Sequence, residues 1–295
     1  MTVANQPSDV AGPTPTTSAD LGEPYPPGDL TPRPSTGCGG NPSPPIGGEM
    51  LESGGAMGHY IITTPPNYDV THPYSLAFVF HGAGESDVSC RGGGNCAGVP
   101  DALEGHSIVV YMKSFGTDWT NDTREQNVTW FDDLLANTKA NYCVDERRVY
   151  AVGTSSGAHF TNLLGCRRGD QLLAVVPAAG QRLETTGCVG RVAALVIHGV
   201  ADSHVPIAEG ERARDDYAQL NGCTTTTVPD LASVDADLQT AFASGVSTIE
   251  CADYQGCIAG LLVRWCEHSD PGYDGTTHGF PVEGGTLAWD FVSQL

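Results

Sequence analysis

Apolar residues occur along the chain in short, nearly continuous runs that are separated by longer stretches of mixed polarity. Runs of this kind, rich in valine, isoleucine, leucine and phenylalanine, are typical of strands that are covered on both faces of a sheet. They predict strands at residues 59–64, 74–80, 107–112, 148–150, 173–177, 192–197 and 260–266.

Helical patterns lie between several of these strands. They predict helices at residues 132–142, from about 160 onward, at 208–220 and at 286–294. Because strands that alternate with helices build parallel sheets, we expect an α/β fold: a mostly parallel, doubly wound sheet with helices on both faces. Residues 224–256 fit neither pattern, and we expect them to form an excursion tied by disulfides, outside the sheet core.

The first part of the chain has a different composition. Residues 1–45 are dominated by proline, threonine, serine and glycine and have few large apolar side chains to bury. Such a composition is typical of an extended linker or a disordered tail. We therefore expect a linker or tail at 1–45 and one folded domain at 46–295.

A Gly-x-Ser-x-Gly motif at residues 153–157 comes shortly after the predicted strand at 148–150 and precedes a helix-compatible run. The order of strand, motif and helix is the one required by a nucleophile elbow, a strained turn that lifts one serine clear of the sheet. With 37 glycines in the chain, a glycine-rich turn without catalytic meaning is the alternative. The pattern makes Ser155 the candidate nucleophile.

A serine hydroxyl needs a base within hydrogen-bond reach and a third group that orients the base. Asp202 follows the predicted strand at 192–197 and His278 follows the last strand, which is the order of α/β-hydrolases. The residues leave two alternatives open: Asp202 as an ordinary loop or cap residue, and His268 as the base. His159, one helical turn after the serine, is interpreted as structural packing.

Acyl transfer also needs donors aimed at the developing oxyanion, and backbone amides can supply them. In this fold they come from the residue after the nucleophile, here Ser156, and from the loop after the strand at 74–80. In that loop Ala83 is the candidate and Gly84 the alternative. A plain glycine-rich turn is the simpler interpretation of the loop.

Charge and cysteine content limit the possible partners. The formal net charge of −21 makes nucleic acid and anionic membranes unsuitable partners, and no apolar run has transmembrane length. Ten cysteines without Cys-x-x-Cys pairs indicate disulfides formed in an oxidising compartment, with buried free thiols as the alternative. The candidate pairs are Cys90 with Cys96, Cys251 with Cys266, and Cys223 with Cys257; the pairing of the other four is left open.

Several motifs taken together resemble one family. They lie at residues 81–82, 153–157, 198–202 and 277–279, and the segments 142–145, 221–223 and 254–257 agree with them. The chain from about residue 38 to 295 resembles the secreted esterases grouped with feruloyl esterases and polyhydroxybutyrate depolymerases, most closely the feruloyl esterase branch. The resemblance implies a disulfide-stabilised α/β-hydrolase fold and a triad of Ser155, Asp202 and His278, without a cofactor or a metal.

The same resemblance implies a secreted serine esterase that acts on hydroxycinnamoyl esters of plant cell-wall polysaccharide, or on small aromatic esters. The alternatives are an acetylxylan esterase, a polyhydroxybutyrate-type polyester depolymerase and, from another class, a non-catalytic carbohydrate-binding protein. Trp119, Trp130 and Phe280 are candidates for stacking on an aromatic acyl group. We expect the protein to act as a monomer.

Overall fold

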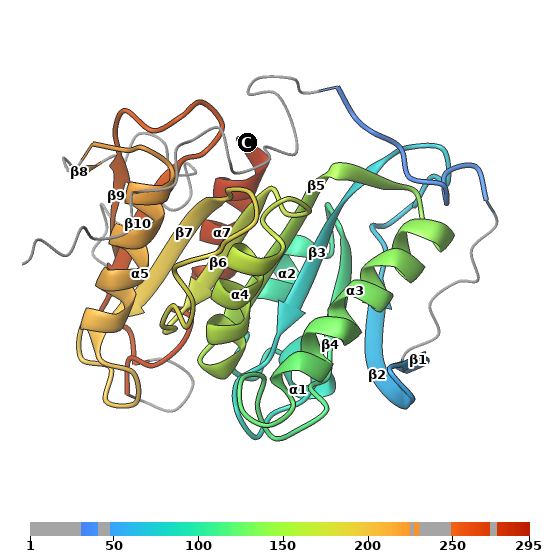
Figure 1. Cartoon of the computed structure of the whole chain (residues 1–295), viewed down its shortest axis with the longest axis horizontal. Helices are drawn as coiled ribbons and strands as arrows, with labels where there is room; N and C mark the ends of the chain where they lie inside the picture. Colours follow the sequence, from blue (N-terminus) through green and yellow to red (C-terminus); the bar gives the residue numbers. More distant parts are fainter. Residues whose placement is uncertain (1–30, 41–47, 225–226, 230–248, 272–275) are drawn as a thin grey trace, which may run out of the picture.

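A computed structural model describes residues 31–40, 48–224, 227–229, 249–271 and 276–295 (Figure 1). The strands are β1 (Gly48–Ser53), β2 (Ala56–Thr63), β3 (Tyr74–Phe80), β4 (Ile108–Met112), β5 (Val144–Thr154), β6 (Ala174–Ala178), β7 (Ala193–Gly199), β8 (Thr227–Pro229), β9 (Ile249–Tyr254) and β10 (Val263–His268). The helices are α1 (Asp87–Arg91), α2 (Val99–Leu103), α3 (Arg124–Asn141), α4 (Ser156–Arg167), α5 (Ile207–Leu220) and α7 (Gly284–Ser293).

The described strands form one sheet of ten in the order β1-β2-β4-β3-β5-β6-β7-β10-β9-β8. Every pair from β4 to β10 along this order is parallel, whereas β1, β2, β9 and β8 add antiparallel edges. The parallel strands are buried, as the continuous apolar runs predicted. The predicted α/β architecture is therefore confirmed.

Helices cover both faces of the sheet. Figure 1 shows α3, α4 and α5 on one face and α2 and α7 on the other. Alternate side chains of β3 divide between two cores: Phe78 packs with Phe131 and Phe160, while Val79 packs with Leu103 and Phe291. This two-sided burial holds the carboxyl ends of the central strands at one edge, where α/β proteins place their ligands.

The structure corrects the prediction for residues 224–256. Residues 249–254 form β9, which pairs antiparallel with β10, so this part belongs to the sheet. Backbone pairing of β8 with β9 adds a further edge strand. Residues 230–248 lie outside the described residues. Pattern alone did not reveal β9 because its sequence mixes charged and apolar residues and has no continuous apolar run.

All ten cysteines form disulfides. The pairs are Cys38–Cys143, Cys90–Cys96, Cys166–Cys188, Cys223–Cys257 and Cys251–Cys266. The three candidate pairs are confirmed, and the alternative of free thiols is wrong. Cys251 and Cys266 lie directly opposite each other across the β9–β10 pair.

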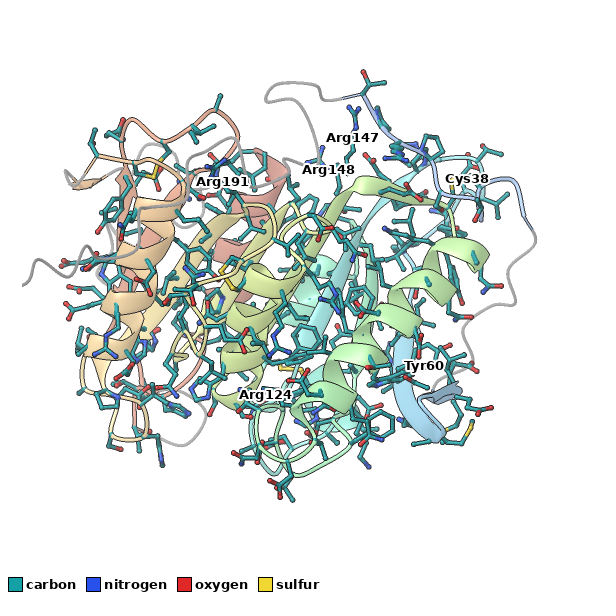
Figure 2. All side chains as sticks on the ribbon, viewed as in Figure 1. Cys38, Tyr60, Arg124, Arg147, Arg148 and Arg191 are labelled. Carbon is teal, nitrogen blue, oxygen red and sulfur yellow. A yellow bond between two sulfur atoms is a disulfide. The ribbon has the colours of Figure 1, made fainter. Side chains whose placement is uncertain are left out.

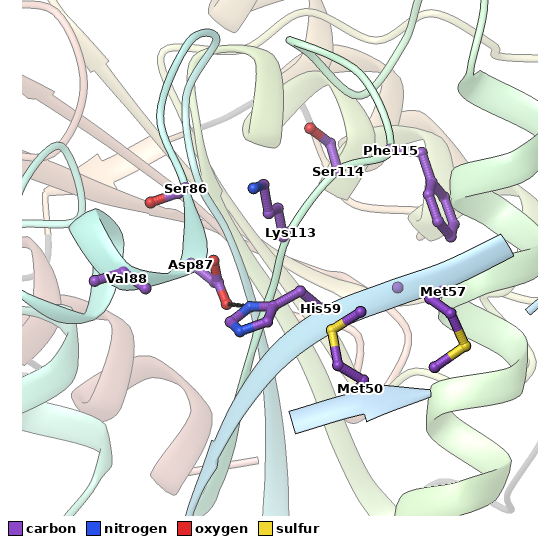
Figure 3. Close-up of a pocket in the computed structure, with 10 residues that line it drawn as sticks. Met50, Met57, His59, Ser86, Asp87, Val88, Lys113, Ser114 and Phe115 are labelled. Carbon is purple, nitrogen blue, oxygen red and sulfur yellow. Dashed lines mark hydrogen bonds and ion pairs between the residues drawn. The ribbon is translucent and has the colours of Figure 1, made fainter. Parts of the chain in front are cut away.

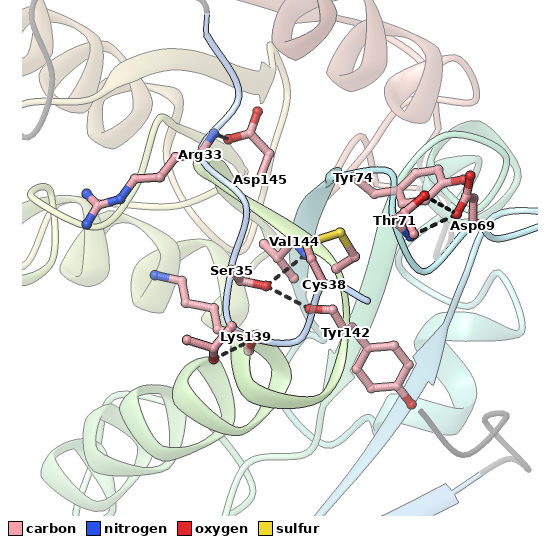
Figure 4. Close-up of a disulfide and its surroundings, with 12 residues drawn as sticks. Arg33, Ser35, Cys38, Asp69, Thr71, Tyr74, Lys139, Tyr142, Val144 and Asp145 are labelled. Atoms are coloured by element: carbon pink, nitrogen blue, oxygen red, sulfur yellow. Dashed lines mark hydrogen bonds between the residues drawn. A yellow bond between two sulfur atoms is a disulfide. The ribbon is translucent and has the colours of Figure 1, made fainter. Parts of the chain in front are cut away.

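Residues 31–40 pack against the domain, although composition assigned them to a linker that ends at residue 45 (Figure 4). The Cys38–Cys143 disulfide joins this segment to the start of β5, and the Ser35 hydroxyl donates to the carbonyl of Tyr142 at 2.8 Å. A β-carbon on Gly37 would overlap the backbone of Tyr142, which explains the glycine. Cross-linking and close packing of this kind belong to a domain, so the expected boundary at 45 does not hold for these ten residues.

Arginine side chains hold several connections at the periphery (Figure 2). Arg147 donates to the carbonyl of Thr31 at 3.0 Å, and Arg191 donates to the carbonyl of Leu220 at the end of α5 at 2.9 Å. Within the described ranges, no helix combines the length and the apolar character needed to cross a bilayer.

Candidate active site

Ser155 lies in a sharp turn between β5 and α4. Its backbone has φ 54° and ψ −120°, a left-handed conformation that non-glycine residues rarely adopt, and its N–H donates to the carbonyl of Ala178 at 2.9 Å. A β-carbon on Gly157 would overlap the carbonyl oxygen of Phe80 and lie 2.6 Å from that of His81. Glycine at 157 therefore lets the first turn of α4 approach the end of β3, and the geometry is that of a nucleophile elbow.

Asp202 lies in the loop after β7 and pairs with His278. Its Oδ2 accepts from Nδ1 of His278 at 2.7 Å, and its Oδ1 accepts from the amides of His204 and Val205 at 2.8 and 2.9 Å. Burial raises the pKa of Asp202, but the hydrogen bonds from His278 and from the two amides outweigh burial and hold the pKa below its usual value. An ionised Asp202 assigns the Nδ1–H tautomer to neutral His278 and leaves Nε2 as an acceptor.

The loop that carries His278 passes over the end of β5. A β-carbon on Gly199 would overlap the carbonyl of Thr277, and one on Gly279 would lie 3.0 Å from the hydroxyl of Thr154, the residue before Ser155. His278 is 5% exposed. The structure thus brings the serine, the histidine and the aspartate from three separate loops to the same edge of the sheet.

Other histidines near Asp202 are engaged elsewhere. Nε2 of His268 bonds to the carbonyl of Gly279 at 3.2 Å, and Nε2 of His198 bonds to the carbonyl of Val205 at 2.9 Å. Burial lowers the pKa of both rings. His198 also lies 3.5 Å from Oδ2 of Asp202, so the acid is flanked by two imidazoles. Of these two rings, His278 makes the shorter contact with Oδ2 of Asp202, at 2.7 Å through Nδ1.

The amides expected to form the oxyanion hole lie next to this group. Ser156 is the first residue of α4, where a helix leaves its N–H groups unpaired. The N–H of Gly84 already donates to the carbonyl of Thr117 at 2.7 Å, whereas the N–H of Ala83 makes no hydrogen bond to any residue that the structure describes. Ala83 and Ser156 therefore remain the candidate pair.

Trp119, Trp130 and Phe280 do not fit the expectation that they bind an aromatic acyl group. Their exposed fractions are 0%, 0% and 3%, and all three lie in the hydrophobic cores. Trp130 packs on β2 beside Tyr60, with ring centroids 6.0 Å apart. Sequence could not separate these roles, because large aromatic side chains fill cores as readily as pockets.

Trp119 has a positioning role instead. Its indole Nε1–H donates to the carbonyl of His81 at 2.8 Å, and its backbone N–H donates to the hydroxyl of Ser156 at 3.1 Å. The indole also stacks on Phe160 of α4. Trp119 therefore ties the loop after β3 to the start of α4, the two segments that carry the candidate oxyanion amides.

A separate pocket of about 560 Å³ lies at the edge formed by β1, β2 and the end of β4 (Figure 3). Met50, Met57 and Phe115 supply apolar surface, and His59 forms an ion pair with the buried carboxylate of Asp87. The pocket adjoins the candidate site through Ser114, whose N–H donates to Nε2 of His81 at 3.2 Å. Sequence patterns did not predict this cavity.

Asn95 is a second feature that sequence reasoning missed. This residue is 2% exposed and lies in the loop closed by Cys90 and Cys96, with its amide beside Gly82. The only sequence signal was the cysteine pair around it. Among the described residues, no group of three or more histidine, cysteine, aspartate or glutamate side chains is arranged to hold a metal ion.

Comparisons with known proteins give sequence relatives and a shared fold. No family model matches the chain. Feruloyl esterase D of Neurospora crassa is 29% identical over 248 residues, which cover 80% of this chain and 81% of that protein. Feruloyl esterase C of Emericella nidulans is 27% identical over 268 residues, 87% of this chain and 90% of that protein.

Among solved structures, an acetyl xylan esterase from Aspergillus awamori superposes with a TM-score of 0.61 at 14% identity. The match covers 83% of this chain and 99% of that structure. Identity this low establishes the shared fold alone. The chain thus has an α/β-hydrolase fold and is similar in sequence to proteins named feruloyl esterases, which supports its assignment as a carboxylic ester hydrolase.

Proposed function

We propose that the protein is a serine esterase in which Ser155 is the nucleophile, His278 the general base and Asp202 the group that orients the base. One observation carries the proposal: the 2.7 Å bond between Asp202 and Nδ1 of His278, formed where the His278 loop passes beside the elbow. This bond leaves Nε2 of the imidazole free to accept the serine proton.

The reaction follows from these roles. Nε2 of His278 takes the hydroxyl proton while Oγ of Ser155 bonds to the ester carbonyl carbon, and the amides of Ala83 and Ser156 donate to the resulting oxyanion. His278 then gives its proton to the leaving alcohol oxygen as the carbon–oxygen bond breaks, which leaves an acyl-enzyme. In the second half of the reaction His278 takes a proton from water as the water oxygen bonds to the acyl carbon. The bond from that carbon to Oγ of Ser155 then breaks, His278 returns the proton to Oγ, and the carboxylic acid is released.

The sequence relatives favour a substrate class. Because they are named feruloyl esterases, we assign this enzyme hydroxycinnamoyl esters of plant cell-wall polysaccharide, with small aromatic esters as surrogates. The five disulfides suit an oxidising environment and support secretion. A net charge of −21 opposes nucleic acid and anionic membranes as partners. We assign a monomer as the acting species.

The first test compares the protein with its Ser155→Ala variant on methyl ferulate and on p-nitrophenyl acetate. Loss of the nucleophile should lower kcat on both esters by on the order of 10⁶-fold. Activity retained by the variant would refute the assignment of Ser155. Turnover of the acetate but not of methyl ferulate by the unmodified protein would refute the substrate class and favour an acetyl esterase.

A matched pair of histidine variants tests the base. His278→Ala should abolish turnover, whereas His268→Ala should keep a measurable kcat because His268 bonds to a carbonyl and not to Asp202. Far-ultraviolet circular dichroism checks that both variants fold. If turnover is lost in His268→Ala but not in His278→Ala, the general base is His268 and the assignment of His278 is wrong.

A further inference from the structure

Asn95 lies in a short loop that is fixed at both ends. The loop follows α1, which is capped by reciprocal hydrogen bonds between Ser86 and Ser89, and the Cys90–Cys96 disulfide closes it. Both cysteines are fully buried. Beyond the disulfide, Gly98 packs so closely on the start of α7 that a β-carbon on Gly285 would overlap its carbonyl. The position of Asn95 is therefore set by rigid neighbours.

Asn95 is nearly buried as a residue, and its Nδ2 donates to no side chain or carbonyl of the residues that the structure describes. The residue is 2% exposed, and its Oδ1 lies 3.6 Å from Sγ of Cys96. That sulfur is bonded to Cys90 and has no hydrogen to donate. Nδ2 of Asn95 is not one of the fully enclosed unpaired atoms among the described residues, so its N–H groups are available to a ligand bound in the site.

The unpaired amide lies beside the candidate nucleophile. A β-carbon on Gly82 would overlap Nδ2 of Asn95 and would lie 3.6 Å from Cβ of Ser155. The backbone carbonyl of Asn95 faces the loop that carries His278, 3.9 Å from where a β-carbon on Gly279 would lie. Asn95 is thus placed between the oxyanion loop, the nucleophile and the loop of the base.

We propose that the Nδ2–H of Asn95 is a third donor to the tetrahedral intermediate, in addition to the amides of Ala83 and Ser156. The inference rests on the proposed function, since it assumes an ester carbonyl attacked by Ser155. An amide suits this task because it donates without carrying a charge that would perturb His278. The Cys90–Cys96 disulfide has the role of presenting this donor.

The test uses Asn95→Asp, which keeps the shape and replaces the donor by an acceptor, and Asn95→Ala. With methyl ferulate, kcat should fall about 100-fold in either variant with KM within about twofold, because the bond forms only in the transition state. Asn221→Asp is the matched control: Asn221 is equally buried, and its amide donates to the carbonyls of Val192 and Leu261 away from the site. It should lower the melting temperature and leave kcat unchanged.

A second readout separates catalysis from packing. Phenylboronic acid, which bonds to an active serine and mimics the tetrahedral adduct, should inhibit the Asn95 variants about 100-fold more weakly, while inhibition by the product ferulate stays the same. An unchanged kcat, or a fall in kcat with boronate inhibition intact, would overturn the role of Asn95. If the unmodified protein hydrolyses no ester, or if Ser155→Ala remains active, the proposed function fails instead.

Discussion

His159 is a partly buried histidine near the candidate base, and its Nε2 atom is buried. Burial, followed by the nearby imidazole of His278, lowers the pKa of His159 to about 4, and its Nε2 makes no hydrogen bond within the described structure. The ring is therefore neutral in the folded protein at mildly acid pH. This agrees with the interpretation of His159 as packing, since a neutral ring on α4 adds no charge to the site.

The lowered pKa of His159 predicts a loss of stability in acid. The unfolded chain takes up this proton near pH 6.5, but the folded protein takes it up only near pH 4, so stability falls as the pH drops through that window. Relative to His159→Gln, the unmodified protein should lose ~3 kcal/mol of unfolding free energy between pH 7 and pH 4. Urea unfolding of both proteins at each pH measures the difference; parallel curves would contradict it.

Individual site residues were predictable to different degrees. Ser155, Asp202 and His278 could be selected as candidates because each follows an apolar strand in the order that the chemistry requires; the structure joins Asp202 to His278 and gives Ser155 the backbone of a sharp turn. Asn95 could not be selected, because its meaning depends on a disulfide and on contacts with distant loops. A polar residue in a glycine-rich loop carries no pattern that indicates burial.

Elements with continuous apolar runs were predicted most accurately. Tyr74–Phe80 was predicted with both of its ends, because Leu76–Phe80 is a continuous apolar run that is buried on both faces of the sheet. Helix α3 begins at Arg124, earlier than the predicted 132, because its first turns bury Asn127 and Val128 among polar neighbours. The helices α1 and α2 have five residues each and are flanked by glycines, so they are too short to show a helical repeat of apolar residues.

The disulfide between Cys38 and Cys143 spans 105 residues and anchors the N-terminal segment at the start of β5. Replacing both cysteines by alanine should lower the unfolding free energy by about 4–5 kcal/mol, since closing a long loop restricts the unfolded chain most. The disulfide joins the start of β5, whereas Ser155 follows the opposite end of this 11-residue strand. Because the two lie far apart, kcat on methyl ferulate should be retained.

The control for this prediction is the double alanine variant of Cys166 and Cys188, whose separation is only 22 residues. Its loss should be smaller, about 3 kcal/mol. Guanidinium unfolding under non-reducing conditions measures both. Equal losses would show that native-state contacts, rather than loop length, set the contribution of these bridges.

The whole molecule carries a formal net charge of −21, and lysine occurs only at positions 113 and 139. Such a field repels anionic substrates over distances that salt shortens, from about 30 Å at 0.01 M to about 3 Å at 1 M ionic strength. KM for a feruloylated oligosaccharide that bears a uronic acid should therefore fall severalfold as salt is raised over this range.

The neutral counterpart without the uronic acid serves as the control, and its KM should stay constant. Steady-state kinetics on both substrates at each ionic strength provide the measurement. If KM changes equally for both substrates, salt acts on the conformation of the protein and not on the electrostatic repulsion between the protein and the uronic acid. Composition alone predicts the sign of this effect, because net charge does not depend on the fold.

The strained backbone of Ser155 links the catalytic role of this residue to the thermal stability of the protein. Its φ of 54° and ψ of −120° suit glycine, and any other residue adopts them at a cost of about 1–3 kcal/mol. Glycine at position 155 would remove that cost together with the hydroxyl. Laboratory evolution that selects for heat resistance without assaying ester hydrolysis would therefore favour this substitution, and would yield a more durable protein that no longer turns over its substrate.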